Sequence, residues 1–119
     1  MLVEVVDRLN LISGRIEGDI TKEVAKRYFQ EVGKVADQKG LNRVITDLRE
    51  ANLKVDERDM RDLSKELAQL GLACTFRRAM VVKNDVNDYK LWENHCLSAG
   101  HKDLRLFSDK DAALEWLAE

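Results

Sequence analysis

The chain contains no proline, only two cysteines and no long hydrophobic run. Without proline there is no proline-rich linker to divide its 119 residues, and a second hydrophobic core would leave each half near the size limit for independent folding. We therefore expect residues 1–119 to form a single domain. Cys74 and Cys96 lack metal-type spacing, which suits a reducing compartment where thiols stay free.

The sequence also lacks an excess of basic residues and a positively charged N-terminal leader. Twenty basic side chains face 22 acidic ones, for a net charge of −2, so attraction to a phosphate backbone is weak and no nucleic-acid partner is expected. No window approaches the roughly 18 apolar residues of a membrane span, and the first residues do not resemble a signal peptide. These absences predict a cytoplasmic protein without a transmembrane segment. With 45% hydrophobic and 35% charged residues, the chain can bury a real core.

Short apolar runs alternate with amphipathic stretches along the chain. Apolar runs at 2–6 and 9–16, separated by Asp7-Arg8, predict an N-terminal hairpin. Further strands are expected at 43–48, 78–82 and 104–107. Helices are expected at 21–38, from Asp56 to about Leu70, from Asn84 or Asp85 to Ala99, and, after a cap at Ser108, over 109–118.

This order of elements predicts the fold class. Parallel neighbours need a crossover connection, and a helix supplies it, so strands that alternate with helices indicate a largely parallel sheet. The antiparallel N-terminal hairpin makes the sheet mixed. We expect an α/β domain with a mixed, mostly parallel sheet and about four helices that cover both of its faces.

Two stretches carry a resemblance to a known family. The residues after Arg43, VITDLREANLKVDERDMRDL, are similar to the STAS pattern of a buried strand ending in Asp47-Leu48, a loop, an aspartate (Asp56) and a helix. The C-terminal half continues with an RAMVV strand, a helix that contains Tyr89 and Trp92, an LRLF strand and a final helix with AALEWL. Together they resemble the SpoIIAA-like family of the STAS / SEC14-like superfamily. The resemblance implies a STAS-like domain with a non-catalytic, regulatory or protein-interaction role.

One departure from that family concerns phosphorylation. Anti-anti-sigma proteins carry a phosphorylatable serine directly after the aspartate that matches Asp56, whereas Glu57 and Arg58 follow it here. A carboxylate is not switched by a kinase, although Glu57 near a helix N-terminus can hold permanently part of the charge that a phosphate would add. Ser64 is not at the matching position and is interpreted as a surface helix serine.

Polar side chains follow two of the predicted central strands. Open α/β sheets bind ligands at the carboxyl edge of their strands, and in STAS-like domains the start of the following helix is a docking surface. The alternative is that the carboxylates only cap loops and helices while the basic side chains are solvated. The predicted partner or ligand surface comprises Asp47, Arg49, Asp56, Glu57, Arg58, Lys83, Asn84 and Asp85.

No spacing in the sequence indicates a catalytic, cofactor or metal site. Neighbours on a helix do not face one another, so we expect Cys96 to be buried as a small apolar residue and His95 to project outward. His101 has no further ligand residue nearby, and the glycines lack phosphate-loop spacing. We therefore expect a protein that is not an enzyme and that uses neither cofactor nor metal.

Two functions remain open. The first is a regulatory module that binds a protein partner. The alternative, suggested by the kinship with SEC14-like lipid carriers, is binding of a small apolar ligand or lipid with peripheral membrane association. The helix with Tyr89, Leu91, Trp92 and Leu97 would then contact the membrane. Homodimerisation through a sheet edge or helix face is left undecided.

Overall fold

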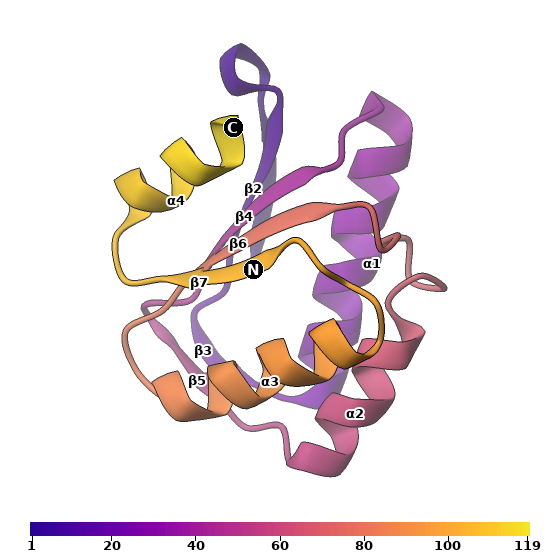
Figure 1. Cartoon of the computed structure of the whole chain (residues 1–119), viewed down its shortest axis with the longest axis vertical. Coiled ribbons are helices and arrows are strands. Elements are labelled where there is room, and N and C mark those ends of the chain that lie inside the picture. Colours follow the sequence, from indigo (N-terminus) through magenta and orange to yellow (C-terminus); the bar gives the residue numbers. More distant parts are fainter.

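Five strands form one mixed sheet in the computed structural model, which describes all 119 residues. The strand order is β1-β2-β4-β6-β7 (Figure 1). β1 is antiparallel to β2, and the other neighbours are parallel. The α/β class, the N-terminal hairpin and the mostly parallel sheet are thus confirmed. The bounds are β1 Leu2–Val6, β2 Leu11–Arg15, β4 Arg43–Asp47, β6 Arg77–Val81 and β7 Leu104–Phe107.

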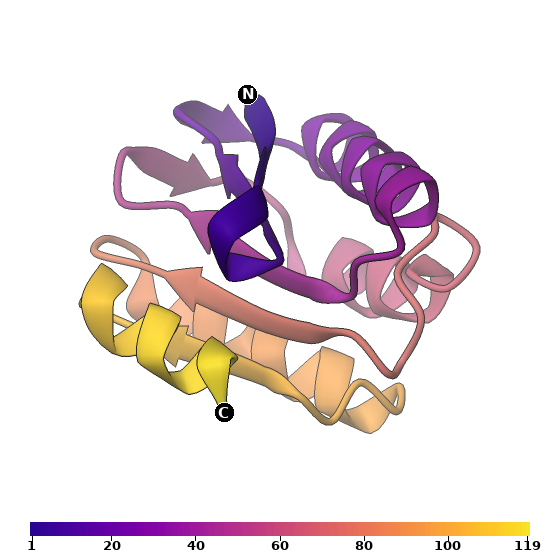
Figure 2. The same cartoon turned by 90° about the horizontal axis from the view of Figure 1, so that it is seen from above.

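Four helices cover the two faces of this sheet unequally. The alternation of side chains along β6 shows the division: Met80 packs with the core under three helices, whereas Ala79 and Val81 pack with the core under the last helix. Figures 1 and 2 show the last helix, α4, apart from the other three. Coverage of both faces is therefore confirmed. The helices are α1 Lys22–Lys39, α2 Glu57–Glu66, α3 Val86–Ser98 and α4 Lys110–Ala118.

A second, small sheet was not expected from the sequence. β3 (Gly18–Ile20) and β5 (Ala51–Leu53) pair in parallel, and their residues had been interpreted as connecting segments. Each strand has three residues, which is too short to display a clear period-2 alternation. In Figure 1 this pair lies beyond the ends of the large sheet, where the chain turns toward α1 and α2. It adds Ile20 and Leu53 to the core on that side.

Two predicted boundaries are wrong. Asp7–Leu9 form a short 3₁₀ turn closed by Asn10 in the left-handed region at φ 52°, so the second strand begins at Leu11 instead of residue 9. α2 ends at Glu66, four residues before the expected end. The Leu72 amide turns back to the Leu67 carbonyl at 2.9 Å, and both leucines are buried. Burial of Leu72 thus replaces the last helical turn.

The predicted helix starts are confirmed in part. Asp56 caps α2 by accepting a hydrogen bond from the Asp59 amide at 2.8 Å, as expected. Asp109, one residue after the predicted Ser108, caps α4 by accepting bonds from the Asp111 and Ala112 amides. The start of α3 at Asp85 is confirmed, but its carboxylate accepts a bond from Leu53 instead of capping the helix.

A close approach joins α1 to the turn after α2. Gly33, inside α1, faces Gly71, which has φ +106°. A Cβ on Gly33 would lie 2.5 Å from the Leu70 carbonyl oxygen and 2.8 Å from the Gly71 Cα. Both glycines are therefore required by the contact, and it brings α1 and α2 together over the same face of the sheet.

Candidate functional site

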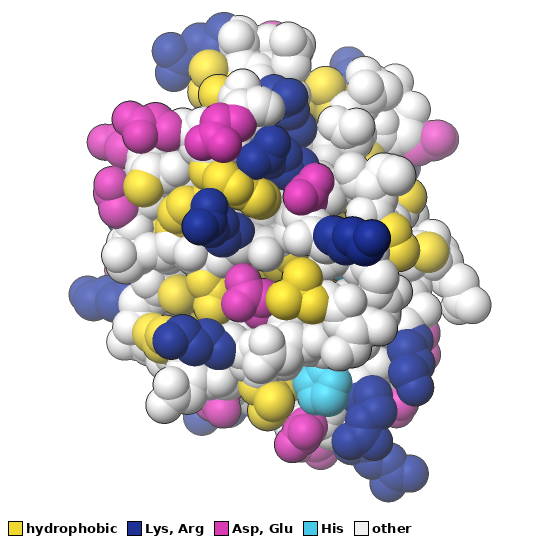
Figure 3. All heavy atoms as spheres, viewed as in Figure 1, with side chains coloured by type: hydrophobic (Ala, Val, Ile, Leu, Met, Phe, Trp, Pro, Cys, Tyr) yellow, Lys and Arg dark blue, Asp and Glu magenta, His cyan; other side chains and the backbone are white.

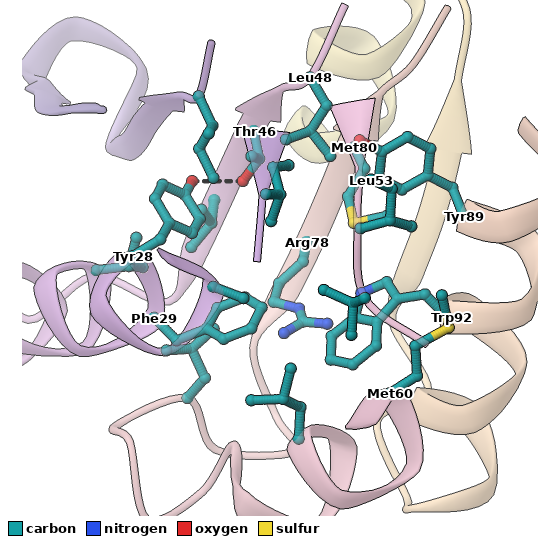
Figure 4. Close-up of a pocket in the computed structure, with 18 residues that line it drawn as sticks. Tyr28, Phe29, Thr46, Leu48, Leu53, Met60, Arg78, Met80, Tyr89 and Trp92 are labelled. Carbon is teal, nitrogen blue, oxygen red and sulfur yellow. Dashed lines mark hydrogen bonds between the residues drawn. The ribbon is translucent and has the colours of Figure 1, made fainter. Parts of the chain in front are cut away.

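A cavity of about 60 Å³ lies between the sheet and helices α1, α2 and α3 (Figure 4). Eighteen residues line it, and all but Thr46 and Arg78 are hydrophobic. The lining follows from amphipathic helices that turn their apolar sides toward the same sheet face. The principal side chains are Tyr28 and Phe29 from α1, Met60 from α2, Tyr89 and Trp92 from α3, and Thr46, Arg78 and Met80 from the sheet.

Arg78 places a positive charge in this apolar space. Its residue is 5% exposed, and Nη1 is buried without a hydrogen-bond partner. Nη2 lies 3.6 Å from Cys96 Sγ, and the guanidinium carbon lies 5.9 Å from the centre of the Phe29 ring. In Figure 4 the guanidinium points into the space bordered by Phe29, Trp92 and Met60. No carboxylate forms an ion pair with it.

The residues around Arg78 explain two shifted pKa values. Burial raises the pKa of the Cys96 thiol to about 11, and the nearby Arg78 charge opposes that shift. Burial also lowers the pKa of His101, and the positive Arg78 shifts it in the same direction. Cys96 is therefore a protonated thiol at neutral pH. Its predicted burial is confirmed, since it is fully enclosed.

Two tyrosine hydroxyls reach the cavity lining and differ in their partners. Tyr28 Oη and Thr46 Oγ1 form a buried hydrogen bond of 2.5 Å, drawn as a dashed line in Figure 4. The Tyr89 hydroxyl is buried and has no partner in the protein. Burial raises the pKa of Tyr28 to about 12, and burial raises that of Tyr89 as well. Both hydroxyls are neutral at physiological pH, so they offer hydrogen bonds rather than charge.

A separate groove of about 660 Å³ runs along the carboxyl edge of the sheet. It brings together three of the predicted surface residues, Asp47, Arg49 and Lys83, and adds Arg15, Glu50 and Lys90. Lys83 and Lys90 take part in none of the ion pairs. Only four of the eleven residues that line the groove are hydrophobic, in contrast to the cavity under the helices. Acidic and basic side chains are also interspersed on the face shown in Figure 3.

Asp47 and Arg49 form the best-ordered charged pair of this groove. Arg49 donates from Nε at 3.0 Å and from Nη2 at 2.8 Å to the two carboxylate oxygens, and its backbone amide adds a third bond at 3.1 Å. These hydrogen bonds hold the pKa of the Asp47 carboxyl below its usual value, against the opposing effect of partial burial. Asp47 is therefore occupied by Arg49 and is a poor candidate for acid-base chemistry.

The other predicted surface residues do not line the groove. Asp56, Glu57 and Arg58 are exposed at the start of α2, while Asn84 and Asp85 are exposed before α3. Glu57 Oε1 lies 3.5 Å from His95 Nε2, although the two atoms are not aligned for a hydrogen bond. The His95 side chain is 18% exposed, so it is partly buried beside the exposed Glu57. The predicted surface is thus divided among the groove, the start of α2 and the residues before α3.

Sequence reasoning missed Arg78 as a site residue. It lies at the beginning of the strand RAMVV, where alternation places Arg78, Met80 and Val82 on one face. A charged residue on the same face as Met80 in a central strand was the available signal.

A second missed arrangement joins two residues far apart in sequence. Cys74 Sγ lies 3.8 Å from His101 Nε2, so the exposed thiol meets the buried histidine. The pair considered in the sequence, His95 and Cys96, does not meet. His101, which has no further ligand residue nearby in the sequence, faces Cys74 in the fold. Ser64, expected on the surface, is buried and donates to the Arg61 carbonyl at 2.8 Å.

The helix proposed to contact a membrane turns two of its named residues inward. Tyr89 and Trp92 are 2% and 7% exposed and belong to the core, so they are not available to a membrane surface. Leu97 is 42% exposed on the same helix. No helix of the protein combines the length and the apolar content that crossing a membrane requires.

No protein-family model matches the chain, and no curated protein matches it.

Proposed function

We propose that this chain is a non-catalytic protein that binds a small apolar or amphiphilic molecule in the cavity beneath α1, α2 and α3. The observation that carries the proposal is the lining, in which sixteen of eighteen residues are hydrophobic. Apolar cavities in close-packed proteins are few, and they accept apolar ligands in preference to water. With about 60 Å³ of free space, the site favours a small ligand, or one end of a longer one.

We also propose that the domain is of the SpoIIAA-like, STAS-like type. The order of strands and helices supports this, as does the aspartate cap at the start of α2 that the resemblance anticipated at Asp56. Because Glu57 occupies the place of the switched serine, a constitutive carrier or sensor suits this chain better than a phosphorylation switch.

Filling the cavity should abolish ligand binding. Ala25 lines the cavity and is 7% exposed, so the two methyl groups added by Ala25→Val would occupy part of the ligand space. We expect hexanol to raise the melting temperature of the unmodified protein, because a ligand that binds only the folded state stabilises it. Ala25→Val should lose that increase, as measured by thermal unfolding over a hexanol series.

The matched control is Ala113→Val. Ala113 is fully buried, but it belongs to the core on the α4 side of the sheet. This variant adds the same volume away from the cavity and should retain the hexanol response. If neither hexanol nor hexanoate ever raises the melting temperature of the unmodified protein, the proposed function is wrong.

A second candidate function is a regulatory module that binds a protein partner, and the groove favours it. Arg15, Arg49, Lys83 and Lys90 outnumber the two acidic residues of the groove in a chain of net charge −2. Lys83 and Lys90 are free of ion pairs, so they can meet an acidic segment of a partner. The exposed start of α2 at Glu57 and Arg58 is the alternative docking surface.

Two variants, each with two reversed charges, test which of these surfaces binds the partner. Lys83→Glu with Lys90→Glu should abolish capture of a protein partner from native extract, while the melting temperature stays nearly unchanged because all four side chains concerned are exposed. Glu57→Lys with Arg58→Glu serves as the matched pair. Loss of the partner only in this second variant would move the docking surface to α2. Capture unaffected by either pair would remove the interaction proposal.

A further inference from the structure

We propose that the ligand of the cavity carries a carboxylate, which the Arg78 guanidinium binds inside the protein. This inference rests on the proposed function, because it names the chemical class of the same ligand. It makes Arg78 the residue that determines ligand specificity. The ligand would enter with its acidic end first and leave its apolar end toward the hydrophobic lining.

Arg78 is a charged side chain that is buried away from water. Removing a charged group from water is costly unless a partner of opposite charge and hydrogen-bond acceptors replace the water. Arg78 is 5% exposed, and Nη1 has no acceptor in the protein. Its only side-chain contact of hydrogen-bonding type is the weak acceptor Cys96 Sγ, at 3.6 Å. The guanidinium is thus a buried donor group that lacks its complement.

No side chain of the protein forms an ion pair with Arg78. The Cys96 thiol is protonated at neutral pH, since burial raises its pKa to about 11. The pKa of Tyr28 is raised to about 12, so its hydroxyl is neutral too. Phe29 offers only the face of its ring, 5.9 Å away. Glu93 is close enough to raise the pKa of Cys96, but it forms no ion pair with Arg78, so a bound carboxylate would supply the missing pair.

The shape of the site favours a carboxylate over a larger anion. A carboxylate accepts two parallel hydrogen bonds from the guanidinium fork. The free space of about 60 Å³ suits a carboxylate group with the first carbons of its chain. A phosphate brings more charge and more acceptor atoms than a single arginine can satisfy. The hydrophobic remainder of the lining matches an aliphatic tail.

Tyr89 adds a second polar contact to the same cavity. Its hydroxyl is buried without a partner in the protein, and the residue lines the cavity together with Arg78. In Figure 4 the Tyr89 ring lies on the α3 side of the cavity, and Trp92 extends from the same helix toward the guanidinium. Trp92 therefore reports directly on a ligand bound at Arg78.

The experiment uses Trp92 fluorescence. The chain has two tryptophans, Trp92 and Trp116, and a Trp116→Phe background leaves Trp92 as the only indole. Hexanoate and hexanol are titrated into this protein, into Arg78→Met and into Arg77→Met. Arg77 is the matched control, because it precedes Arg78 on β6 and stacks on Trp116, 4.2 Å from the ring centre, under α4.

The expected result is selective loss of acid binding. Arg78→Met should weaken hexanoate binding about tenfold to a hundredfold, as for a lost charge-assisted hydrogen bond, and should leave hexanol binding nearly unchanged. Arg77→Met should alter neither. Arg78→Lys keeps the charge without the planar fork and should bind hexanoate with intermediate affinity, which preserves the test if Arg78→Met does not fold.

The outcomes separate this inference from the proposed function. If neither hexanol nor hexanoate binds the starting protein, both are wrong. If hexanol binds as tightly as hexanoate, or Arg78→Met retains hexanoate affinity, only the carboxylate assignment is wrong. If inorganic phosphate competes better than acetate, the anion class is wrong. Affinity that keeps rising from hexanoate to laurate identifies a fatty acid as the source, and a maximum at hexanoate identifies a free short-chain acid.

Discussion

Replacing Gly33 by alanine is expected to lower the melting temperature by about 10 °C, which corresponds to about 3 kcal/mol of unfolding free energy. The new Cβ would lie 2.5 Å from the Leu70 carbonyl oxygen and 2.8 Å from the Gly71 Cα. Both are backbone atoms, so no side-chain rotation relieves the overlap. Thermal unfolding followed by circular dichroism measures the effect.

The sign of this result is informative because helix propensity predicts the opposite. Alanine in the middle of an exposed helix stabilises it by about 1 kcal/mol relative to glycine. Lys34→Ala, at the exposed position next to Gly33, is the control and should change stability by less than about 0.5 kcal/mol. A Gly33→Ala protein as stable as the starting protein would show that α1 and the turn after α2 do not approach as described.

Arg78→Met is expected to raise the unfolding free energy by about 2 kcal/mol in the absence of ligand. Methionine keeps an unbranched apolar chain up to about the position of Nε, and it removes a charge that forms no ion pair with a carboxylate of the protein. Urea denaturation of both proteins measures the gain. The comparison requires that their unfolding free energies fall with urea concentration at the same slope.

Arg77→Met provides the comparison and should have the opposite sign. This side chain stacks on Trp116 and reaches the chain end at Glu119, with Nη1 3.3 Å from the Glu119 carbonyl oxygen. Its loss should cost about 0.5 to 1 kcal/mol. If Arg78→Met instead destabilises the protein by more than Arg77→Met, Arg78 has a structural role and its burial is no sign of a ligand.

The large sheet and the four helices could be predicted because their signals are long. α1 repeats its apolar positions over eighteen residues, and the central strands are short, largely apolar runs between turns, so both signals are visible in the sequence. β3 and β5 have three residues each and show no period. The end of α2 was missed because burial of Leu72 outweighs the helical pattern that continues to Leu70.

The candidate site was predictable only where it follows from topology. Asp47, Arg49 and Lys83 meet because the carboxyl ends of parallel strands meet at one edge. The cavity depends on how completely side chains from three helices and the sheet fill a shared volume, and no local pattern encodes that volume. The meeting of Cys74 with His101 likewise depends on two connections that are distant in sequence.

The two cysteines differ in exposure, and this difference makes it possible to measure the motion of α3. Cys74 is exposed, whereas Cys96 lies inside α3, fully enclosed behind the helix that closes the cavity. A thiol reagent can reach Cys96 only in molecules in which α3 has moved away from the sheet or the chain has unfolded, so the rate at which Cys96 is alkylated equals the fraction of such open molecules multiplied by the reactivity of the freed thiol. Alkylation of Cys96, compared with that of the exposed Cys74, therefore measures for how much of the time the helix that covers the cavity is open.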